Sequence, residues 1–259
     1  MRFSTVFAVL VLSGMLLACG DGGTSAMSWP EVTRQNKPWT YWWWLGSAVD
    51  EPNLTEHLEK YHKAGLGGVH IIPIYGVKGY EQRYVEYLSP RWMEMLAHTV
   101  KEAEHLDMGV DMSTGTGWPF GGPGVSVKDA TAAVLFGKYE VEGGNELAEP
   151  VKSEYRKDGV EARLQALMAY SDDGDILDLT EKVDQSGHLD WVAPKGKWRL
   201  YAVFQGLGGK KVERAAPGGA GYIIDPFSCD SLKKYLERFD EAFAGYKGGL
   251  PRAFYHDSY

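Results

Sequence analysis

The residues best suited to chemistry lie in the stretch 108–124, where a short apolar run reaching Asp111 opens into a glycine-rich loop around Trp118. An indole ring can stack on the C–H face of a sugar, while carboxylates and backbone groups hold the sugar hydroxyls. The stretch therefore predicts one wall of a sugar site. An ordinary glycine-rich turn closed by a core tryptophan is the alternative.

The same loop argues against a nucleotide site. A dinucleotide fingerprint needs a third glycine at position 120, which is Phe120, and the loop lacks the Gly-Lys-Ser/Thr ending of a P-loop. The chain carries 27 Lys and Arg against 35 Asp and Glu, a net charge of −8, without a basic cluster. Nucleic acid is therefore a poor candidate partner, and a neutral ligand fits better.

Two carboxylates are candidates for glycoside chemistry, which needs a pair of acids flanking the bond. Asp111 and Asp257 each come at the end of an apolar run. Either could instead hold sugar hydroxyls or a metal ion, and we favour that role for both. Asp50 and Glu51 are weaker candidates, because the first turn of a surface helix attracts acids in any case.

In a β/α barrel, the groups that contact a ligand come from the C-terminal ends of the strands and share one rim. The substrate-binding residues expected on this rim, with Tyr259 beside them, are Trp44, Tyr75, Asp111, Trp118 and Asp257. The tryptophans of the run at 42–44 could instead simply pack, alternately inside and outside the barrel. We favour this packing role for Trp42 and Trp43. His70, among isoleucines, is interpreted as a core histidine, and Tyr75 could equally be a loop residue. No group of residues has zinc-ligand spacing.

The N-terminus predicts a bacterial lipoprotein signal over residues 1–18. A charged start is followed by an apolar run over 7–17 and a small residue before Cys19. The run is shorter than the roughly 20 residues of a transmembrane helix, the alternative explanation. We expect an exported lipoprotein of the periplasm, outer membrane or cell surface, held by a lipid on Cys19 and a tether over 19–36. Cys229 then has no intrachain partner, so the fold must be stable without disulfides.

The fold class expected is α/β. Short apolar runs at 39–46, 68–75 and 109–112 alternate with helical periodicity, which is typical of a parallel sheet covered by helices. One helix is expected to start at Asn53 as its cap, with Glu56 completing a capping box, and to end at Gly65. Another is capped by Ser89. Its inward stripe is expected to be Met93, Leu96, Val100 and Ala103.

The pattern changes after Pro123. Runs at 133–141, 162–171 and 198–205 are joined by turn residues with little helical periodicity, which predicts an antiparallel β insertion over 132–210. The α/β style resumes over 211–259, with a helix capped by Asp225 or Ser228 and a last strand that ends in an acid. The residues expected on the buried face of that helix are Leu232, Tyr235, Leu236, Phe239 and Phe243.

The expected architecture is thus the first four or so strands of a TIM-like (β/α)8 barrel, begun over 37–131 and interrupted by the insertion. A closed barrel normally needs far more residues than these, and a final strand without a following helix leaves one face uncovered. We therefore expect the chain to be truncated and, as a fragment, to be only marginally stable.

Several segments together resemble glycoside hydrolase family 106, the α-L-rhamnosidases. They are residues 42–46, 65–69, the Trp118 loop at 115–123, 221–228 and the ending 257–259. The Trp118 loop is the most specific, and the resemblance covers essentially everything after the tether. Gly124 departs from the pattern, since a bulkier residue is expected there.

The resemblance implies hydrolysis, with inversion, of terminal α-L-rhamnosyl bonds in plant-type polysaccharides or glycoconjugates. It also implies a catalytic pair of glutamates and calcium in such sites. The family pattern continues Asp-Ser-Tyr into a catalytic glutamate, so catalytic residues are expected beyond Tyr259 and the fragment itself is expected to be inactive. Two alternatives stay open, a glycoside hydrolase of another specificity and a non-catalytic glycan-binding lipoprotein that uses Trp44 and Trp118.

Overall fold

The computed structural model describes residues 29–256 and Ser258. The chain divides into two units, residues 1–33 and residues 34–259. In the first unit the described residues, 29–33, form no helix or strand, and Trp29 is 95% exposed. The expected signal at 1–18, Cys19 with most of the tether, Asp257 and Tyr259 lie outside the described residues, and these expectations stay predictions.

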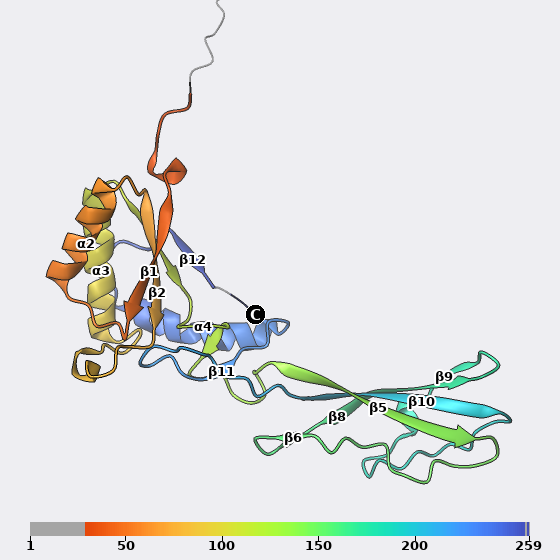
Figure 1. The fold of residues 1–259 in the computed structure, drawn as a ribbon. Helices are drawn as coiled ribbons and strands as arrows, with labels where there is room; N and C mark the ends of the chain where they lie inside the picture. The colour runs from red at the N-terminus through yellow and green to blue at the C-terminus, as the bar shows by residue number, and fades with distance from the viewer. Residues whose placement is uncertain (1–28, 257, 259) are drawn as a thin grey trace, which may run out of the picture. The chain divides into compact units, whose positions relative to one another are not determined.

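The second unit contains a four-stranded parallel sheet (Figure 1). Its strands, in spatial order, are β1 (Trp39–Leu45), β2 (Gly68–Ile74), β3 (Gly109–Ser113) and β12 (Ala253–Tyr255), and each neighbouring pair is parallel. The four strands match the α/β fold expected from the sequence. Within the described residues they form an open four-stranded sheet, and the expected barrel stays a prediction.

Two long helices cover one side of this sheet and lie side by side, α2 (Glu51–Lys63) and α3 (Pro90–His105) (Figure 1). Ser89 caps α3 as predicted, its side chain accepting from the Trp92 N–H. The prediction that Asn53 caps α2 is wrong. Asp50 is the cap and accepts the Asn53 N–H at 3.1 Å, because Pro52 fits the first turn and leaves the extended residue before Glu51 to act as N-cap.

The sheet has one apolar face and one mixed face, as strand alternation requires. Trp42, Trp44, Ile71 and Met112 face the helices and are buried. They pack in one core with a set of helical residues that includes Leu54, Leu58, Trp92 and Leu96. The register places Trp43 beside Ile72 and Ser113 beside Tyr255 on the opposite face, where Trp43 is 56% exposed.

The antiparallel part follows β4 (Gly121–Gly122). Its sheet has the order β5 (Ala132–Glu142), β10 (Lys197–Leu207), β8 (Arg163–Ser171) and β9 (Ile176–Asp178), with antiparallel pairing throughout. A second apolar core that includes Trp198, Leu200 and Leu167 packs on one face. The remaining short elements are η1 (Arg34–Asn36), η2 (Glu81–Arg83), β6 (Arg156–Lys157), β7 (Val160–Glu161), η3 (Thr180–Lys182) and β11 (Tyr222–Ile223).

Helix α4 (Cys229–Ala244) leads back to the parallel sheet. Ser228 caps it, and Tyr235 and Phe239 are buried in the first core as expected. Leu232 is 41% exposed instead of buried, since it lies in the first turn, before the helix meets the core. No helix among the described residues has the length and apolarity needed to cross a bilayer.

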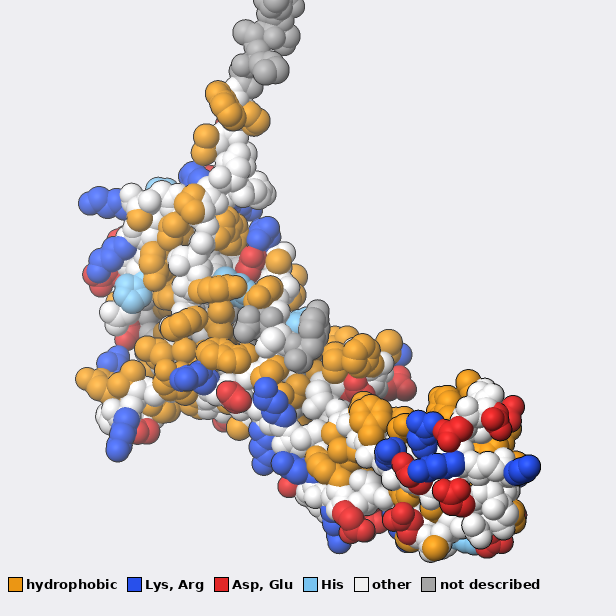
Figure 2. All heavy atoms as spheres, turned by 45° about the vertical axis from the view of Figure 1, so that its right-hand side comes forward, with side chains coloured by type: hydrophobic (Ala, Val, Ile, Leu, Met, Phe, Trp, Pro, Cys, Tyr) orange, Lys and Arg blue, Asp and Glu red, His pale blue; other side chains and the backbone are white. Residues whose placement is uncertain are grey.

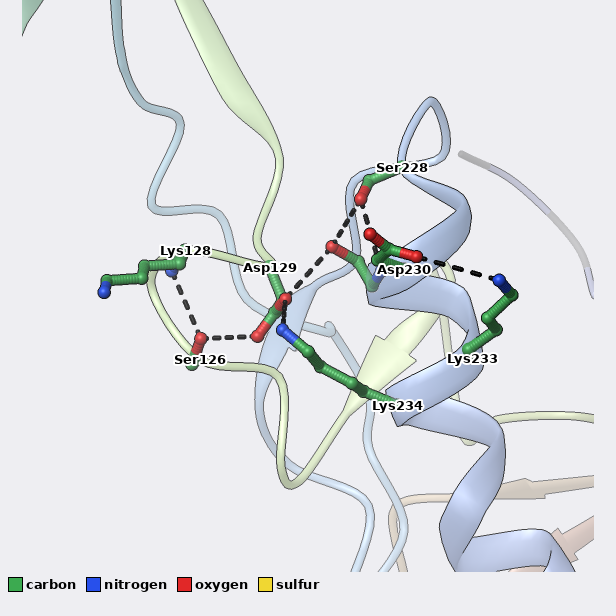
Figure 3. A network of polar contacts seen from close by, with 8 residues as sticks. Ser126, Lys128, Asp129, Ser228, Asp230, Lys233 and Lys234 are labelled. Carbon is green, nitrogen blue, oxygen red and sulfur yellow. Dashed lines mark hydrogen bonds and ion pairs between the residues drawn. The ribbon is translucent and has the colours of Figure 1, made fainter.

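A polar network holds the two ends of the insertion together (Figure 3). Asp129, 8% exposed, lies just before β5, and its carboxylate accepts from Ser126, from Ser231 at 3.1 Å and from Lys234 at 2.9 Å. Ser231 and Lys234 belong to α4, beyond the insertion. The network therefore joins the segment that enters the insertion to the helix that follows it.

Candidate functional site

A pocket of about 190 Å³ lies at the C-terminal ends of the parallel strands, under the Trp118 loop. It is lined by Tyr41, Trp43, Ile72, Ser113, Gly115, Thr116, Gly117, Trp118, Phe120, Tyr255 and His256. The described lining residues are mostly aromatic and apolar, and none of them is Asp, Glu, Lys or Arg. Hydrophobic side chains also crowd the face of the parallel-sheet part that is turned to the viewer in Figure 2. Such a pocket suits a neutral ligand that offers C–H faces.

Two tryptophans reach the pocket from different elements. Trp43 comes from β1, on the face away from the helices, and Trp118 comes from the loop after β3. The peptide bond between Trp118 and Pro119 is cis. The structure thus places Trp118 where the sequence predicted it, at the tip of the third strand and on the wall of a pocket.

The Trp118 loop is held by backbone contacts to a distant segment. Trp118 and Glu213 exchange N–H···O bonds of 3.1 and 2.8 Å. Gly117 has a φ of +56°, and a Cβ there would lie 2.1 Å from the Glu213 carbonyl oxygen. Only glycine allows this approach, so Gly117 is needed both for the turn and for the close contact with the Glu213 backbone.

Two buried tyrosines donate hydrogen bonds to backbone carbonyls at the start of the Trp118 loop. Tyr87 donates to the Ser113 carbonyl at 3.0 Å, and the Tyr235 hydroxyl lies 2.8 Å from the Thr114 carbonyl oxygen and 2.9 Å from that of Gly121. Burial raises the pKa of Tyr235 to about 12 against the opposing effect of Arg238, and burial also raises the pKa of Tyr87 well above its usual value. Both hydroxyls therefore stay protonated and act as hydrogen-bond donors to the loop.

Trp44, expected on the rim, lies in the core instead. Its side chain is 1% exposed and packs against Trp92 and Trp42, with ring centroids 5.5 and 6.0 Å apart. Because side chains alternate along a strand, the position that faces the pocket is Trp43. The expectation that Trp44 binds substrate does not fit this position.

Asp111 lies in the middle of β3 and does not line the pocket. Its oxygens accept from Arg252 Nε at 3.0 Å and Nη2 at 2.6 Å, and the Arg252 guanidinium lies 4.2 Å from the centroid of the Trp39 ring. Both carboxylate oxygens are thus engaged within the fold, which differs from the substrate-binding role expected for Asp111. Asp50 is the N-cap of α2, so it has the helix-start role that made it a weaker candidate for chemistry.

His70 has the core position expected for it, 9% exposed between the rings of Tyr41 and Tyr255 at 5.3 and 4.8 Å. Its Nε2 has no hydrogen-bond partner in the described part of the chain. Burial lowers the pKa of His70, and the nearby Asp111 charge opposes that shift. The imidazole therefore favours its neutral form beneath the pocket.

Tyr75, the remaining expected rim residue, is 44% exposed after β2 and lies outside the lining. Arg214 connects it to Trp118, because the Arg214 Cζ lies 5.3 Å from the Tyr75 ring centroid and 5.8 Å from that of Trp118. Tyr75 also donates its N–H to the Arg214 carbonyl at 2.9 Å. Tyr75 is therefore a neighbour of the pocket through Arg214.

Asp257 is not described, but its neighbours show that the end of the chain approaches the pocket. The His256 ring stacks on Phe120 with centroids 4.5 Å apart, and Ser258 accepts the Phe120 N–H at 2.9 Å. A larger cavity of about 920 Å³ lies between α3 and α4, away from the Trp118 loop. We assign the site to the smaller pocket, because the larger one lies on the helical side of the sheet.

Sequence reasoning missed Trp43, Phe120, Tyr255 and Arg214 as site residues. The expected parallel sheet could have placed Tyr255 and Trp43 on one of its faces, but alternation alone does not tell which face is inward. Arg214 comes from the segment that returns from the insertion, and nothing in the sequence pairs that segment with the Trp118 loop. No group of three or more His, Cys, Asp or Glu in residues 29–256 and Ser258 is arranged to hold a metal ion.

One family model matches most of the chain. The family model described as alpha-L-rhamnosidase, glycoside hydrolase family 106, matches residues 31–165 and 152–251. A Formosa agariphila protein named "Putative beta-glucuronidase" is 24% identical over 255 residues, which cover 80% of this chain and 22% of that protein.

The fold is similar to that of a solved rhamnosidase from Novosphingobium sp. PP1Y, with a TM-score of 0.64 and 14% identity. The match covers 88% of this chain and 39% of the rhamnosidase. The chain therefore spans well under half the length of either relative.

Proposed function

This chain belongs to glycoside hydrolase family 106, and we propose that its pocket holds the terminal rhamnose of a substrate that an inverting α-L-rhamnosidase hydrolyses. The observation that carries the proposal is the apolar pocket between Trp43 and Trp118, at the C-terminal ends of parallel strands. Ligand sites of β/α folds gather at this end. Rhamnose offers a methyl group and C–H faces that such walls can cover.

The charge of the lining supports a neutral sugar over a uronic acid in this pocket. A uronate carboxylate buried here would meet no Lys or Arg among the lining residues, and an unpaired charge is costly to desolvate. The glucuronidase name of the Formosa relative thus has no counterpart in the pocket of this chain.

The described pocket residues bind and orient the sugar rather than cleave it. Trp43 and Trp118 cover sugar faces, while the tyrosine-supported loop keeps Trp118 in place. We propose that the catalytic carboxylates are not among the described residues, since no acid lines the pocket and Asp111 is paired with Arg252. The calcium implied by the family resemblance finds no fitting group of side chains there either, so no step is derived through a metal.

The test is binding and turnover with α-L-rhamnosides. We expect a rhamnoside to bind the chain, and Trp118→Ala to weaken that binding roughly tenfold, because truncating a tryptophan that anchors a ligand typically costs more than about 1 kcal/mol. Trp29→Ala is the matched control, since Trp29 is 95% exposed and outside the pocket. Titration calorimetry measures both.

A second function, glycan binding without catalysis, is favoured by the stacking surfaces of Trp43 and Trp118 in a lining whose described residues include no Asp or Glu. It predicts the same Trp118 dependence with no release of rhamnose in any assay. If neither binding nor turnover is detected with any α-L-rhamnoside, both functions are excluded.

A further inference from the structure

Three arginines of the parallel-sheet part lie over aromatic rings, and one of them differs from the others. Arg252 pairs with Asp111, and Arg238 donates to the Gly218 carbonyl at 3.2 Å. Arg214 lies over Tyr75 and Trp118, is exposed, and has no hydrogen-bond or ion-pair partner for its guanidinium among the described residues. Its adjacent carboxylate, Glu213, makes no ion pair with it.

The position of Arg214 is fixed by its backbone. The φ of Arg214 is +56°, a left-handed conformation that is unfavourable for a long side chain. Three backbone hydrogen bonds hold the segment, two between Glu213 and Trp118 and one from Tyr75 to Arg214. Bulky residues in this region persist where the surroundings over-determine them, which often happens at ligand sites.

The position of the Arg214 guanidinium beside the pocket suggests which ligand group it binds. Trp118 lines the pocket, and the Arg214 guanidinium lies near its ring, whereas no Asp, Glu, Lys or Arg is among the described residues that line the pocket. Arg214 does not line the pocket, but its Cζ lies 5.8 Å from the centroid of the Trp118 ring, so a cation that a second sugar unit could meet lies beside this wall of the pocket. A guanidinium pairs with planar or tetrahedral oxyanions through two parallel hydrogen bonds.

We propose that Arg214 binds an anionic group, a carboxylate or a sulfate ester, on the sugar next to the one in the pocket. This inference rests on the proposed function and deepens it, because it assigns an acidic glycan as the substrate class. The rings of Tyr75 and Trp118 lie 5.3 and 5.8 Å from the guanidinium carbon, while its N–H groups make no hydrogen bond within the described residues and are available to an anion. The uncharged pocket then binds a neutral sugar, and the Arg214 guanidinium binds the anionic sugar next to it.

The experiment compares binding of three rhamnosyl disaccharides by titration calorimetry. One ends in a uronic acid, one is its uncharged methyl ester, and one carries a sulfate ester in place of the carboxylate. We expect at least one anionic probe to bind about fivefold to tenfold more tightly than the ester at low ionic strength, as charge-assisted hydrogen bonds of a partly exposed pair allow. The advantage should shrink when salt is raised to about 0.5 M.

Arg214→Asn is the informative variant, because asparagine tolerates a positive φ better than other residues apart from glycine. It should lose the preference for the anionic probes, so that all three probes bind this variant with the same affinity. Arg214→Lys keeps the charge but loses the planar guanidinium, and should retain part of the preference. Lys195→Asn, which removes a charge from an exposed turn of the antiparallel part, is the control and should behave as the wild type.

The outcomes separate the two proposals. Equal binding of anionic and neutral probes to the wild type, or a preference that survives in Arg214→Asn, overturns the role of Arg214 and leaves the rhamnose pocket standing. A preference for sulfate alone or for carboxylate alone identifies the source of the anion. Failure of every probe to bind overturns the proposed function and this inference with it.

Discussion

Adjacent tryptophans in β1 have opposite physical roles. Trp44 is 1% exposed and Trp43 is 56% exposed, although they are neighbours in sequence. The buried indole stabilises the contact between the sheet and α3 through Trp92, while the exposed indole is free to meet a ligand. Packing in the core and the lining of the pocket are therefore assigned to different members of one run.

The buried member can be tested separately from the pocket. Trp44→Ala should lower the free energy of unfolding by about 3 to 5 kcal/mol, as for other large-to-small changes in a core. Trp44→Phe should cost less, because it also removes the Nε1 donor, which has no hydrogen-bond partner among the described residues. Chemical denaturation measures both changes. A folded Trp44→Phe protein that no longer binds rhamnosides would contradict this assignment.

The site could be predicted in part at this scale. Trp118 was found because glycines and a tryptophan after an apolar run have few other uses together. Trp44 was misplaced because the direction of a side chain across a sheet depends on which face the helices cover, and the strand pattern alone is symmetric. Arg214 was missed because a contact across the insertion has no local signal.

At the scale of elements, the insertion is fixed where it leaves and rejoins the parallel-sheet part. Thr131 accepts from Gly208 at 2.8 Å and donates to Ile223 at 3.0 Å, beside the Asp129 network. Asp129 thus ties the entering strand to α4, which also carries the Tyr235 that supports the Trp118 loop. Loss of the Asp129 hydrogen bonds should therefore also disturb the pocket, because α4 carries the Tyr235 that supports the Trp118 loop.

Asp129 should make stability depend on pH. The hydrogen bond from Lys234 is the largest cause that lowers the pKa of Asp129, followed by that from Ser126. A lowered folded-state pKa means that the stabilisation is fully present above the unfolded value of about 3.9 and is lost as the pH falls through the folded value. We expect stability to drop below about pH 4 in part through Asp129.

Asp129→Asn should lower stability at neutral pH by about 1 to 2 kcal/mol and flatten its loss in acid. Asp230→Asn is the matched control, since its pair with Lys233 is almost fully exposed (Figure 3). Thermal unfolding between acidic and neutral pH measures the slopes. Equal acid sensitivity in the wild type and Asp129→Asn would contradict the role of this carboxylate.

Element boundaries were more predictable than element contacts. Ser89 and Ser228 as caps, and the strands on both sides of the insertion, follow from capping chemistry and periodicity. The Asn53 cap was wrong by three positions, since Asp50 and Pro52 offered an earlier start that the capping-box pattern obscured. The pairing of Trp118 with Glu213 could not be predicted, because a contact between residues so far apart in the sequence produces no periodic pattern.

The second unit contains two separate apolar cores. One packs the parallel sheet against its helices, and the other packs the antiparallel sheet against its loops. Residues Ala132 and Leu207 are directly paired at the point where the antiparallel part begins and ends. A short connection there could replace the antiparallel part without stretching the chain.

Replacing residues 132–206 by a short glycine-rich link should therefore leave the parallel-sheet part folded and able to bind rhamnosides. The expected loss is about 1 to 3 kcal/mol, because two hydrogen bonds and the packing of Val160 against the first core disappear. The two hydrogen bonds are Tyr155 to the Leu207 carbonyl at 2.6 Å and Tyr222 to Asp158 at 2.8 Å. Circular dichroism, calorimetric unfolding and rhamnoside titration measure the outcome. If the shortened chain unfolded or lost binding while Leu207 and the Asp129 network were kept, the antiparallel part would have to be an integral support of the pocket and not an independently packed insertion.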